Sequence, residues 1–238
     1  MPGLAPTSRR RVDTLQDRAA APGRLRHGRG EQVGRHRHAH AFAAVVLAGE
    51  YVEVGDTGCH RVGPGSVLFH DAFEAHRHVA GSAGAEVFVL PVERPAPMAH
   101  GQVADADAVV RLAERDWRAA AAALIANSVP TWFEPRDWPE LLARELCADP
   151  RLGLAAWAER HGLHAGSLSR GFRALFGVTP AQFRAVQKSR RAVAALTEID
   201  RPLSDVAIAS GFADQAHMAR AVRARTGRTA SELRGRLS

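Results

Sequence analysis

The C-terminal third of the chain contains the same short pattern twice, about 50 residues apart. Ala158 stands four residues before Gly162 in the first copy, and Ala207 stands four residues before Gly211 in the second. A small residue is needed where two helices cross closely, and glycine permits the positive φ of a tight turn between them. Each copy therefore predicts a helix-turn-helix unit, which restricts this part of the chain to an all-helical fold.

The repeat continues beyond the two turns, where Leu168 and Met218 anchor the second helix of each unit. Five further pairs match at an offset of 50: Arg170 with Arg220, Arg173 with Arg223, Gly177 with Gly227, Thr179 with Thr229, and Arg184 with Arg234. Both threonines start a capping box, with Gln182 and Glu232 three residues later. Between the copies, the segment from Thr179 to Pro202 predicts one uninterrupted helix of about 17 to 20 residues, roughly 26 to 30 Å long.

The charge is distributed unevenly along the chain. Residues 151–238 hold 15 basic and 6 acidic side chains, a balance of +9, whereas residues 1–150 hold 17 basic and 19 acidic ones, a balance of −2. A compact basic domain favours a polyanionic partner such as nucleic acid. A solvated charged surface is the other interpretation, and because all the basic residues but Lys188 are arginine, the arginine count alone does not decide between them.

Residues 150 to 236 resemble the DNA-binding domain of the AraC/XylS family of bacterial transcription regulators. The resemblance is carried by the sequences Leu-Ser-Arg-Gly-Phe-Arg at 168–173, Gly-Val-Thr-Pro at 177–180 and Gly-Phe-Ala-Asp-Gln-Ala-His-Met-Ala-Arg at 211–220. It implies two helix-turn-helix units on a rigid connecting helix, with both recognition helices in successive segments of the major groove. The predicted connector is compatible with one duplex turn of about 34 Å.

The expected DNA-binding residues fall into two groups. Residues in the first turn of each recognition helix are expected to face base edges: His164, Ala165, Gly166 and Ser167, and Asp214, Gln215 and His217. Arginines further along suit phosphates: Arg170, Arg173, Arg220 and Arg223. For Arg170 and Arg220, an intradomain salt bridge or a solvated charge is an equal alternative. His164 replaces a common serine N-cap, and Gly166 weakens the helix, so we expect the first recognition helix to be less well ordered.

The rest of the chain predicts a different fold class. Short alternating or apolar stretches separated by glycines predict a small β-barrel over residues 31–94. Residues 1–30 are expected to be a disordered tail. Residues 95–149 are expected to be a helical connector that packs on the barrel or on a second subunit, with one helix over residues 105–127 and another beginning after Asp137. The predicted fold is thus α+β, ending in an all-α domain over residues 150–238.

Histidines concentrate in the predicted barrel. His36, His38 and His40 alternate, so on a strand they share one face, and His76 could meet them across the barrel. With Gly63-Pro-Gly65 this arrangement resembles the cupin barrel, the sensor half of many AraC-type regulators. Because residues 39–47 contain no carboxylate, we expect no metal and no cofactor, and place these four histidines in an effector pocket. Rim or surface positions are the alternative.

These expectations define a sequence-specific, DNA-binding transcription regulator rather than an enzyme, acting in the cytoplasm. The expected partners are double-stranded DNA and a small-molecule effector, with a homodimer through the connector helices and RNA polymerase as further candidates. The apolar runs fall short of the roughly 18 residues that span a bilayer, so no membrane partner is expected. Two alternatives are a metal-dependent cupin, either metal sensor or enzyme, with a fused DNA-binding domain, and an architectural DNA-binding protein without a ligand.

Overall fold

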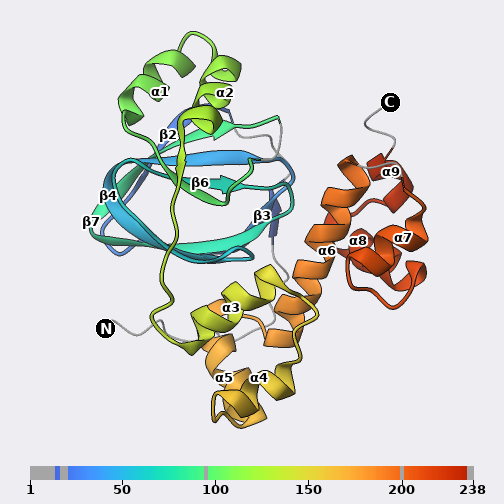
Figure 1. The fold of residues 1–238 in the computed structure, drawn as a ribbon. Coiled ribbons are helices and arrows are strands. Elements are labelled where there is room, and N and C mark those ends of the chain that lie inside the picture. The colour runs from blue at the N-terminus through green and yellow to red at the C-terminus, as the bar shows by residue number, and fades with distance from the viewer. Residues whose placement is uncertain (1–13, 17–20, 94–95, 199–200, 235–238) are drawn as a thin grey trace. The chain divides into compact units, whose positions relative to one another are not determined.

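The computed structural model describes residues 14–16, 21–93, 96–198 and 201–234, and these form two compact units (Figure 1). One unit lies within residues 9–134 and is built mainly of strands, and the other lies within residues 135–238 and is helical. The predicted α+β class, with a β-domain followed by a helical domain, is confirmed.

The described strands of the first unit form one nine-stranded sheet. They are β1 (Thr14–Gln16), β2 (Gly23–His27), β3 (Gln32–His38), β4 (Phe42–Gly55), β5 (Gly58–Val62), β6 (Ser66–His70), β7 (Ala75–Pro91), β8 (His100–Gln102) and β9 (Val129–Pro130). The long strands β4 and β7 pair with each other. In addition, β4 pairs with β5 and β6, and β7 pairs with β2 and β3. The sheet thereby wraps around an interior (Figure 1).

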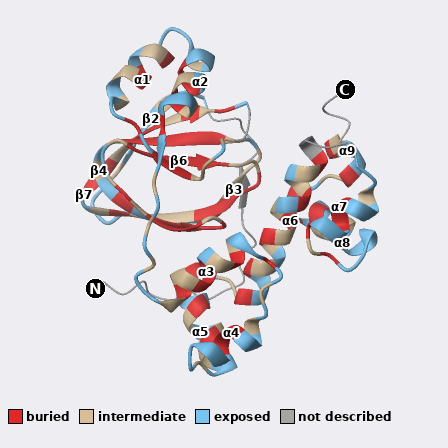
Figure 2. Cartoon of the chain, in the orientation of Figure 1, coloured by how far each residue is buried: buried red, intermediate tan, exposed pale blue. Residues whose placement is uncertain are grey.

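The first half of β4 is apolar at every position because both faces of the sheet are covered there. Ala43 and Val45 pack beneath two helices, and Ala44 and Val46 face the interior of the barrel. Figure 2 shows the resulting concentration of buried residues in the central strands. A strand covered on both faces loses the alternating pattern that marks a half-exposed strand.

A pair of glycines permits the bend in the long strands. Gly49 has φ 70°, and a Cβ built there would overlap Gly84 O and lie 2.9 Å from Gly84 C. The register between β4 and β7 shifts beside this contact, between Gly49 and Tyr51. Beyond the bend, β4 pairs with β5, so the residues that follow line a different part of the barrel.

The predicted disordered tail, residues 1–30, is wrong for part of its length. β2 pairs along β7, and Arg24 and Arg26 flank Glu86 on the neighbouring strand at 2.8 and 3.3 Å. β1 runs parallel to β3. Backbone pairing at a sheet edge requires no apolar side chain, which is why composition alone concealed these strands. Residues 1–13 and 17–20 lie outside the described part of the chain.

The predicted connector, residues 95–149, is divided between the units. Its first part forms α1 (Ala106–Ala113) and α2 (Trp117–Asn127), which pack on the sheet through Val109 and Leu124. The expected single helix is wrong because Asp116 is an N-cap that accepts from the N–H groups at 118 and 119, each at 3.0 Å. Its last helix, α3 (Trp138–Ala148), begins after Asp137 as predicted and belongs to the C-terminal unit.

The C-terminal unit continues after α3 with six helices in its described residues. They are α4 (Leu154–Arg160), α5 (Ala165–Phe176), α6 (Pro180–Glu198), α7 (Leu203–Ala209), α8 (Gln215–Thr226) and α9 (Ala230–Arg234). The predicted connecting helix is confirmed as α6, whose 19 residues span about 28 Å. α3 and α5 pack on α6, as do α7, α8 and α9 (Figure 1).

The two helix-turn-helix units repeat in three dimensions. Their turns contain Gly162 at φ 63° and Gly211 at φ 88°. The alanine carbonyl four residues earlier accepts from the N–H that follows each glycine, at 2.8 Å in the first unit and 2.9 Å in the second. Both recognition helices, α5 and α8, then end in a left-handed glycine, at Gly177 and Gly227. The repeat seen in the sequence is therefore a repeat of backbone conformation.

Both predicted capping boxes form. The Thr179 N–H donates to the Gln182 side chain at 2.9 Å, and the Gln182 N–H donates to Thr179 Oγ1 at 3.2 Å. Thr229 and Glu232 make the same pair of bonds at 2.6 and 3.2 Å. These reciprocal bonds fix where α6 and α9 begin.

Candidate nucleic-acid interface and buried histidine cluster

The two recognition helices begin differently. Asp214 caps α8, because its Oδ1 accepts from the His217 N–H at 2.7 Å. His164 occupies the equivalent position before α5 and makes no side-chain capping bond. A missing cap is worth about 1 kcal/mol of helix stability, so α8 has the better anchored first turn. This agrees with the expected weakness of the first recognition helix.

Most side chains predicted to face bases are on the surface. His164, Ala165 and Gly166 are exposed and Ser167 is partly buried. In the second unit, Asp214, Gln215 and His217 are all exposed.

Two of these three residues in the second unit, Asp214 and His217, already make contacts within the protein. The carboxylate of Asp214 is used as the cap, and the His217 ring packs edge-on against Phe212 with centroids 5.2 Å apart. In the described part of the chain, no hydrogen bond or ring contact involves the Gln215 side chain. Gln215 is thus the member of the group whose side chain takes part in neither a cap nor a ring contact among the described residues.

The four arginines predicted to contact phosphate are exposed. Among the described residues, no ion pair involves Arg170, Arg173 or Arg220. Hydrogen bonds from Thr229 lower the pKa of the exposed Glu232 carboxyl, and the nearby charge of Arg223 lowers it further. The intradomain salt bridge considered for Arg170 and Arg220 is absent from the described residues.

Other arginines of this unit bind backbone carbonyls. Arg184 Nη1 donates to Leu152 O at 3.3 Å, and Arg234 Nη2 donates to Arg201 O at 2.6 Å, so this matched pair repeats its contact as well. Such arginines add positive charge while holding helices together. The sequence repeat identified the pair but not its structural role.

Three of the four histidines predicted for the barrel converge. β3 carries His36 and His38, and β7 carries His76, with His36 directly opposite His76 in the register. Ring centroids lie 4.4 Å apart for His36 and His76 and 5.3 Å apart for His38 and His76. His40 follows the end of β3, is exposed and does not join them.

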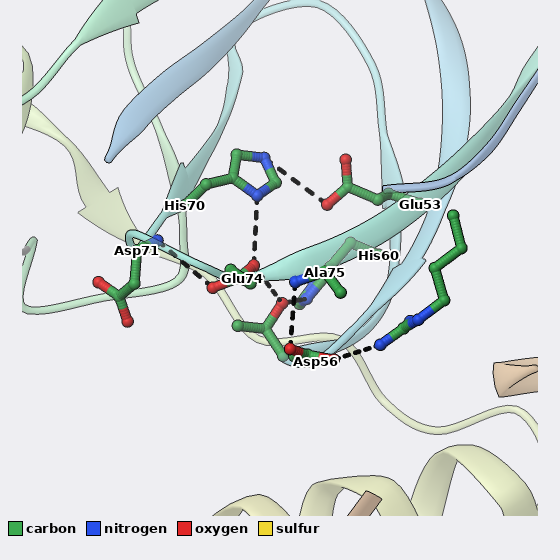
Figure 3. Close-up of polar contacts among 9 residues, drawn as sticks. Glu53, Asp56, His60, His70, Asp71, Glu74 and Ala75 are labelled. Carbon is green, nitrogen blue, oxygen red and sulfur yellow. Dashed lines mark hydrogen bonds and ion pairs between the residues drawn. The ribbon is translucent and has the colours of Figure 1, made fainter. Parts of the chain in front are cut away.

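A second buried group adjoins these histidines and was not expected from the sequence. His70 Nδ1 lies 3.2 Å from Glu74 Oε1, and His70 Nε2 lies 3.7 Å from Glu53 Oε1 (Figure 3). Glu53 and His70 are each 3% exposed, and Glu74 is 1% exposed. Alternation with the buried Tyr51 on β4 could have indicated that Glu53 points inward.

Further contacts hold Glu74 in place. The Thr57 hydroxyl donates to Glu74 Oε1 at 3.3 Å, and the Asp71 N–H donates to Glu74 Oε2 at 3.4 Å. His60 Nε2 lies 3.1 Å from the same Thr57 hydroxyl (Figure 3). Both oxygens of this carboxylate are therefore fixed in front of His70.

Burial sets the protonation of the cluster. It raises the pKa of Glu53 to about 7, against the opposing influence of His70. Burial disfavours the charged form of His70, but the carboxylates of Glu53 and Glu74 outweigh it and raise the His70 pKa. Burial lowers the pKa of His76 well below its ordinary value and that of His38 to about 4. The last two rings are therefore neutral at pH 7, the form in which imidazole binds metals.

Two groups of potential metal ligands result. His36, His38 and His76 form one, and Glu53, His70 and His76 form the other, and within each group the ligand atoms lie within 4.8 Å of one another. His36 Nδ1 lies 2.8 Å from Gly34 O, which favours the tautomer with its lone pair on Nε2. His76 is common to both groups.

Comparison with known proteins identifies the helical unit. Residues 157–236 match the family model described as a helix-turn-helix domain. The match confirms the helix-turn-helix fold predicted for this part of the chain. No curated protein matches the chain. Among the described residues, no helix is long and apolar enough to cross a membrane.

Several solved structures are similar to the chain. An apo form of a ToxT variant from Vibrio cholerae shows 9% identity and a TM-score of 0.43, covering 95% of this chain and 100% of its own. ToxT with a bound unsaturated fatty acid shows 10% identity and a TM-score of 0.42, covering 91% and 96%. A probable AraC family regulator from Rhodopseudomonas palustris shows 19% identity and a TM-score of 0.38, covering 40% and 93%.

Proposed function

We propose that the chain is a sequence-specific DNA-binding transcription regulator whose DNA binding responds to an effector bound by the N-terminal barrel. The observation that carries the proposal is the repeated pair of helix-turn-helix units on α6, each with an exposed recognition helix. The family match over residues 157–236 supports the DNA-binding part.

The geometry of the helical unit suits two contacts on one face of a duplex. α6 spans about 28 Å, close to the ~34 Å that separates successive major-groove segments. Gln215 lies in the first turn of α8, where its amide could donate to and accept from one adenine. Arg170, Arg173, Arg220 and Arg223 would contact phosphates, which orients the helices without reading sequence. α8 would be the more selective reader, because its first turn is capped.

An effector can control DNA binding only if the protein has two states, and if the effector and the DNA each bind these two states with different affinities. An effector in the barrel would change how the helical unit meets its operator, either directly or through dimerisation. RNA polymerase is the further partner we propose for an activator. The protein would act in the cytoplasm, without catalysis of its own.

Selection of binding sites from a random DNA pool with the purified full-length protein tests this function. We expect one recurring sequence to be enriched, and its affinity to fall steeply between 50 and 200 mM salt, since each phosphate contact contributes a slope near −0.9. A folded protein that enriches no sequence and binds DNA without salt dependence would rule the function out. Salt-dependent binding without enrichment would instead support the architectural alternative.

A further inference from the structure

Glu53, His70 and His76 bring three potential ligand atoms together in the interior of the barrel. The three side chains come from β4, β6 and β7, and none is more than 4% exposed. Their ligand atoms lie within 4.8 Å of one another. Such a group of polar atoms is unfavourable inside a protein unless hydrogen bonds or an ion compensate it.

The distance between Glu53 and His70 fits two ligands of one ion better than a hydrogen bond. Oε1 and Nε2 are 3.7 Å apart, beyond the range of N–H···O bonds. Two ligands at about 2.1 Å from a tetrahedral ion are roughly 3.4 Å apart. Within the described part of the chain, this is the one polar contact of the Glu53 carboxylate.

Glu74 occupies the position of an outer partner for His70. A metal-binding histidine generally donates its second ring N–H to a carboxylate or carbonyl, which fixes the ring and its tautomer. His70 Nδ1 lies 3.2 Å from Glu74 Oε1, which favours a proton on Nδ1, and Nε2 points toward Glu53 (Figure 3). An ion between Nε2 and Glu53 would take the place of any proton on Nε2. The carboxylate that orients His70 is itself held by Thr57 and by the backbone of Asp71.

His76 supplies an independent indication. Its Nδ1 is buried and has no hydrogen-bond partner in the described residues. Burial and the surrounding histidines keep the ring neutral, so one of its nitrogens offers a lone pair. A buried nitrogen without a partner is costly, and metal coordination in this cluster would account for keeping such a ring here.

We propose that Glu53, His70 and His76 bind one divalent transition-metal ion of the zinc type, with Glu74 orienting His70. The carboxylate distinguishes this set from His36, His38 and His76, which offers only neutral ligands to a dication. The sequence-based expectation of no metal rested on the lack of a carboxylate in residues 39–47. Glu53 supplies one from beyond the bend in β4.

Metal titration of the chelator-treated full-length protein tests the site without DNA, so its outcome is independent of the proposed function. We expect about one Co²⁺ or Zn²⁺ per chain, with the visible absorption of low-coordinate Co²⁺ and a metal-dependent rise in Tm. Glu53→Gln and His70→Gln should each weaken Zn²⁺ binding at least tenfold, and Glu74→Gln should weaken it about 10- to 100-fold. His40→Gln, on an exposed histidine outside the cluster, should bind as the parent does.

Two results would overturn the assignment. One is a folded, chelator-treated protein that takes up no stoichiometric metal. The other is retention of full affinity by Glu53→Gln and His70→Gln together with its loss in His36→Gln and His38→Gln, which would place an ion in the all-histidine group instead. If Glu53→Gln or His70→Gln does not fold, Glu74→Gln provides the same comparison, because it leaves the three proposed ligands in place and changes only the carboxylate that orients His70.

Discussion

The indole of Trp138 occupies the space that a side chain on Gly171 would need. A Cβ built at Gly171 would overlap Trp138 Cζ2 and lie 2.9 Å from Cη2. This contact joins α3 to the first recognition helix, so α3 is a part of the DNA-binding unit and its packing sets the position of α5.

Gly171→Ala should therefore destabilise the helical unit by about 1 to 3 kcal/mol, because the indole must move. Gly166→Ala in the same helix is the matched control, since its Cβ would meet only the mobile guanidinium of Arg170 at 3.1 Å. Relief of the glycine penalty should make that variant more stable by up to about 1 kcal/mol. Urea unfolding followed by circular dichroism measures both. Equal effects of the two substitutions would contradict the packing argument.

The unequal caps of the recognition helices lead to a second prediction. Asp214→Ala should cost about 0.5 to 2 kcal/mol, because the His217 N–H loses its acceptor. His164→Ser should instead stabilise the protein by about 0.5 to 1 kcal/mol by supplying the missing cap before α5. Thermal unfolding of both variants gives the comparison. A neutral Asp214→Ala variant would mean that the cap contributes nothing in solution.

Base reading and phosphate contact can be separated on α8. Gln215→Ala should lose roughly 1 to 3 kcal/mol on the selected operator and relax preference at one or two base pairs. Arg220→Ala should weaken binding to all sequences alike and reduce the salt slope by about one. Arg220 is chosen because it has no ion pair in the described residues, so its replacement leaves no carboxylate behind. Binding to operator and scrambled DNA across a salt series is the measurement.

An equal loss on both DNAs for Gln215→Ala would show that this residue reads no base. A loss confined to the operator for Arg220→Ala would show that this arginine reads bases rather than phosphates.

The buried carboxylate should make stability depend on pH in the metal-free protein. Glu53 has a folded-state pKa of about 7, above its ordinary value of 4.5, so the folded state binds the extra proton between these values. Its contribution to stability is therefore present below pH 4.5 and is lost as the pH rises to 7. Glu53→Gln should gain about 1 to 3 kcal/mol relative to the parent over this range.

Urea unfolding in the presence of chelator at several pH values measures this difference. Glu50→Gln, an exposed position on the same strand, is the control and should show no such trend. A constant difference between Glu53→Gln and the parent from pH 4.5 to 7 would contradict the burial of this carboxylate.

The helical unit could be predicted because its rules are local. Gly211 predicts a left-handed turn, and Thr179 with Gln182 predicts the start of a helix, and each prediction needs only a few neighbouring residues. The barrel was less predictable because its contacts join distant strands. Nothing near Glu53 in the sequence indicates His70, and β2 exists only through its pairing with β7. The helix predicted over residues 105–127 is in fact two helices, because apolar periodicity does not reveal that Asp116 caps a new helix.

The paired contacts of Arg184 with Leu152 and of Arg234 with Arg201 have an evolutionary consequence. Each half of the unit has its own arginine-to-carbonyl hydrogen bond, and neither bond involves the residues expected to contact bases. Substitutions at Gln215 or around Ala165 can therefore accumulate without disturbing the scaffold. Under the proposed function, the two units can therefore change their DNA preference one at a time while both keep their shape.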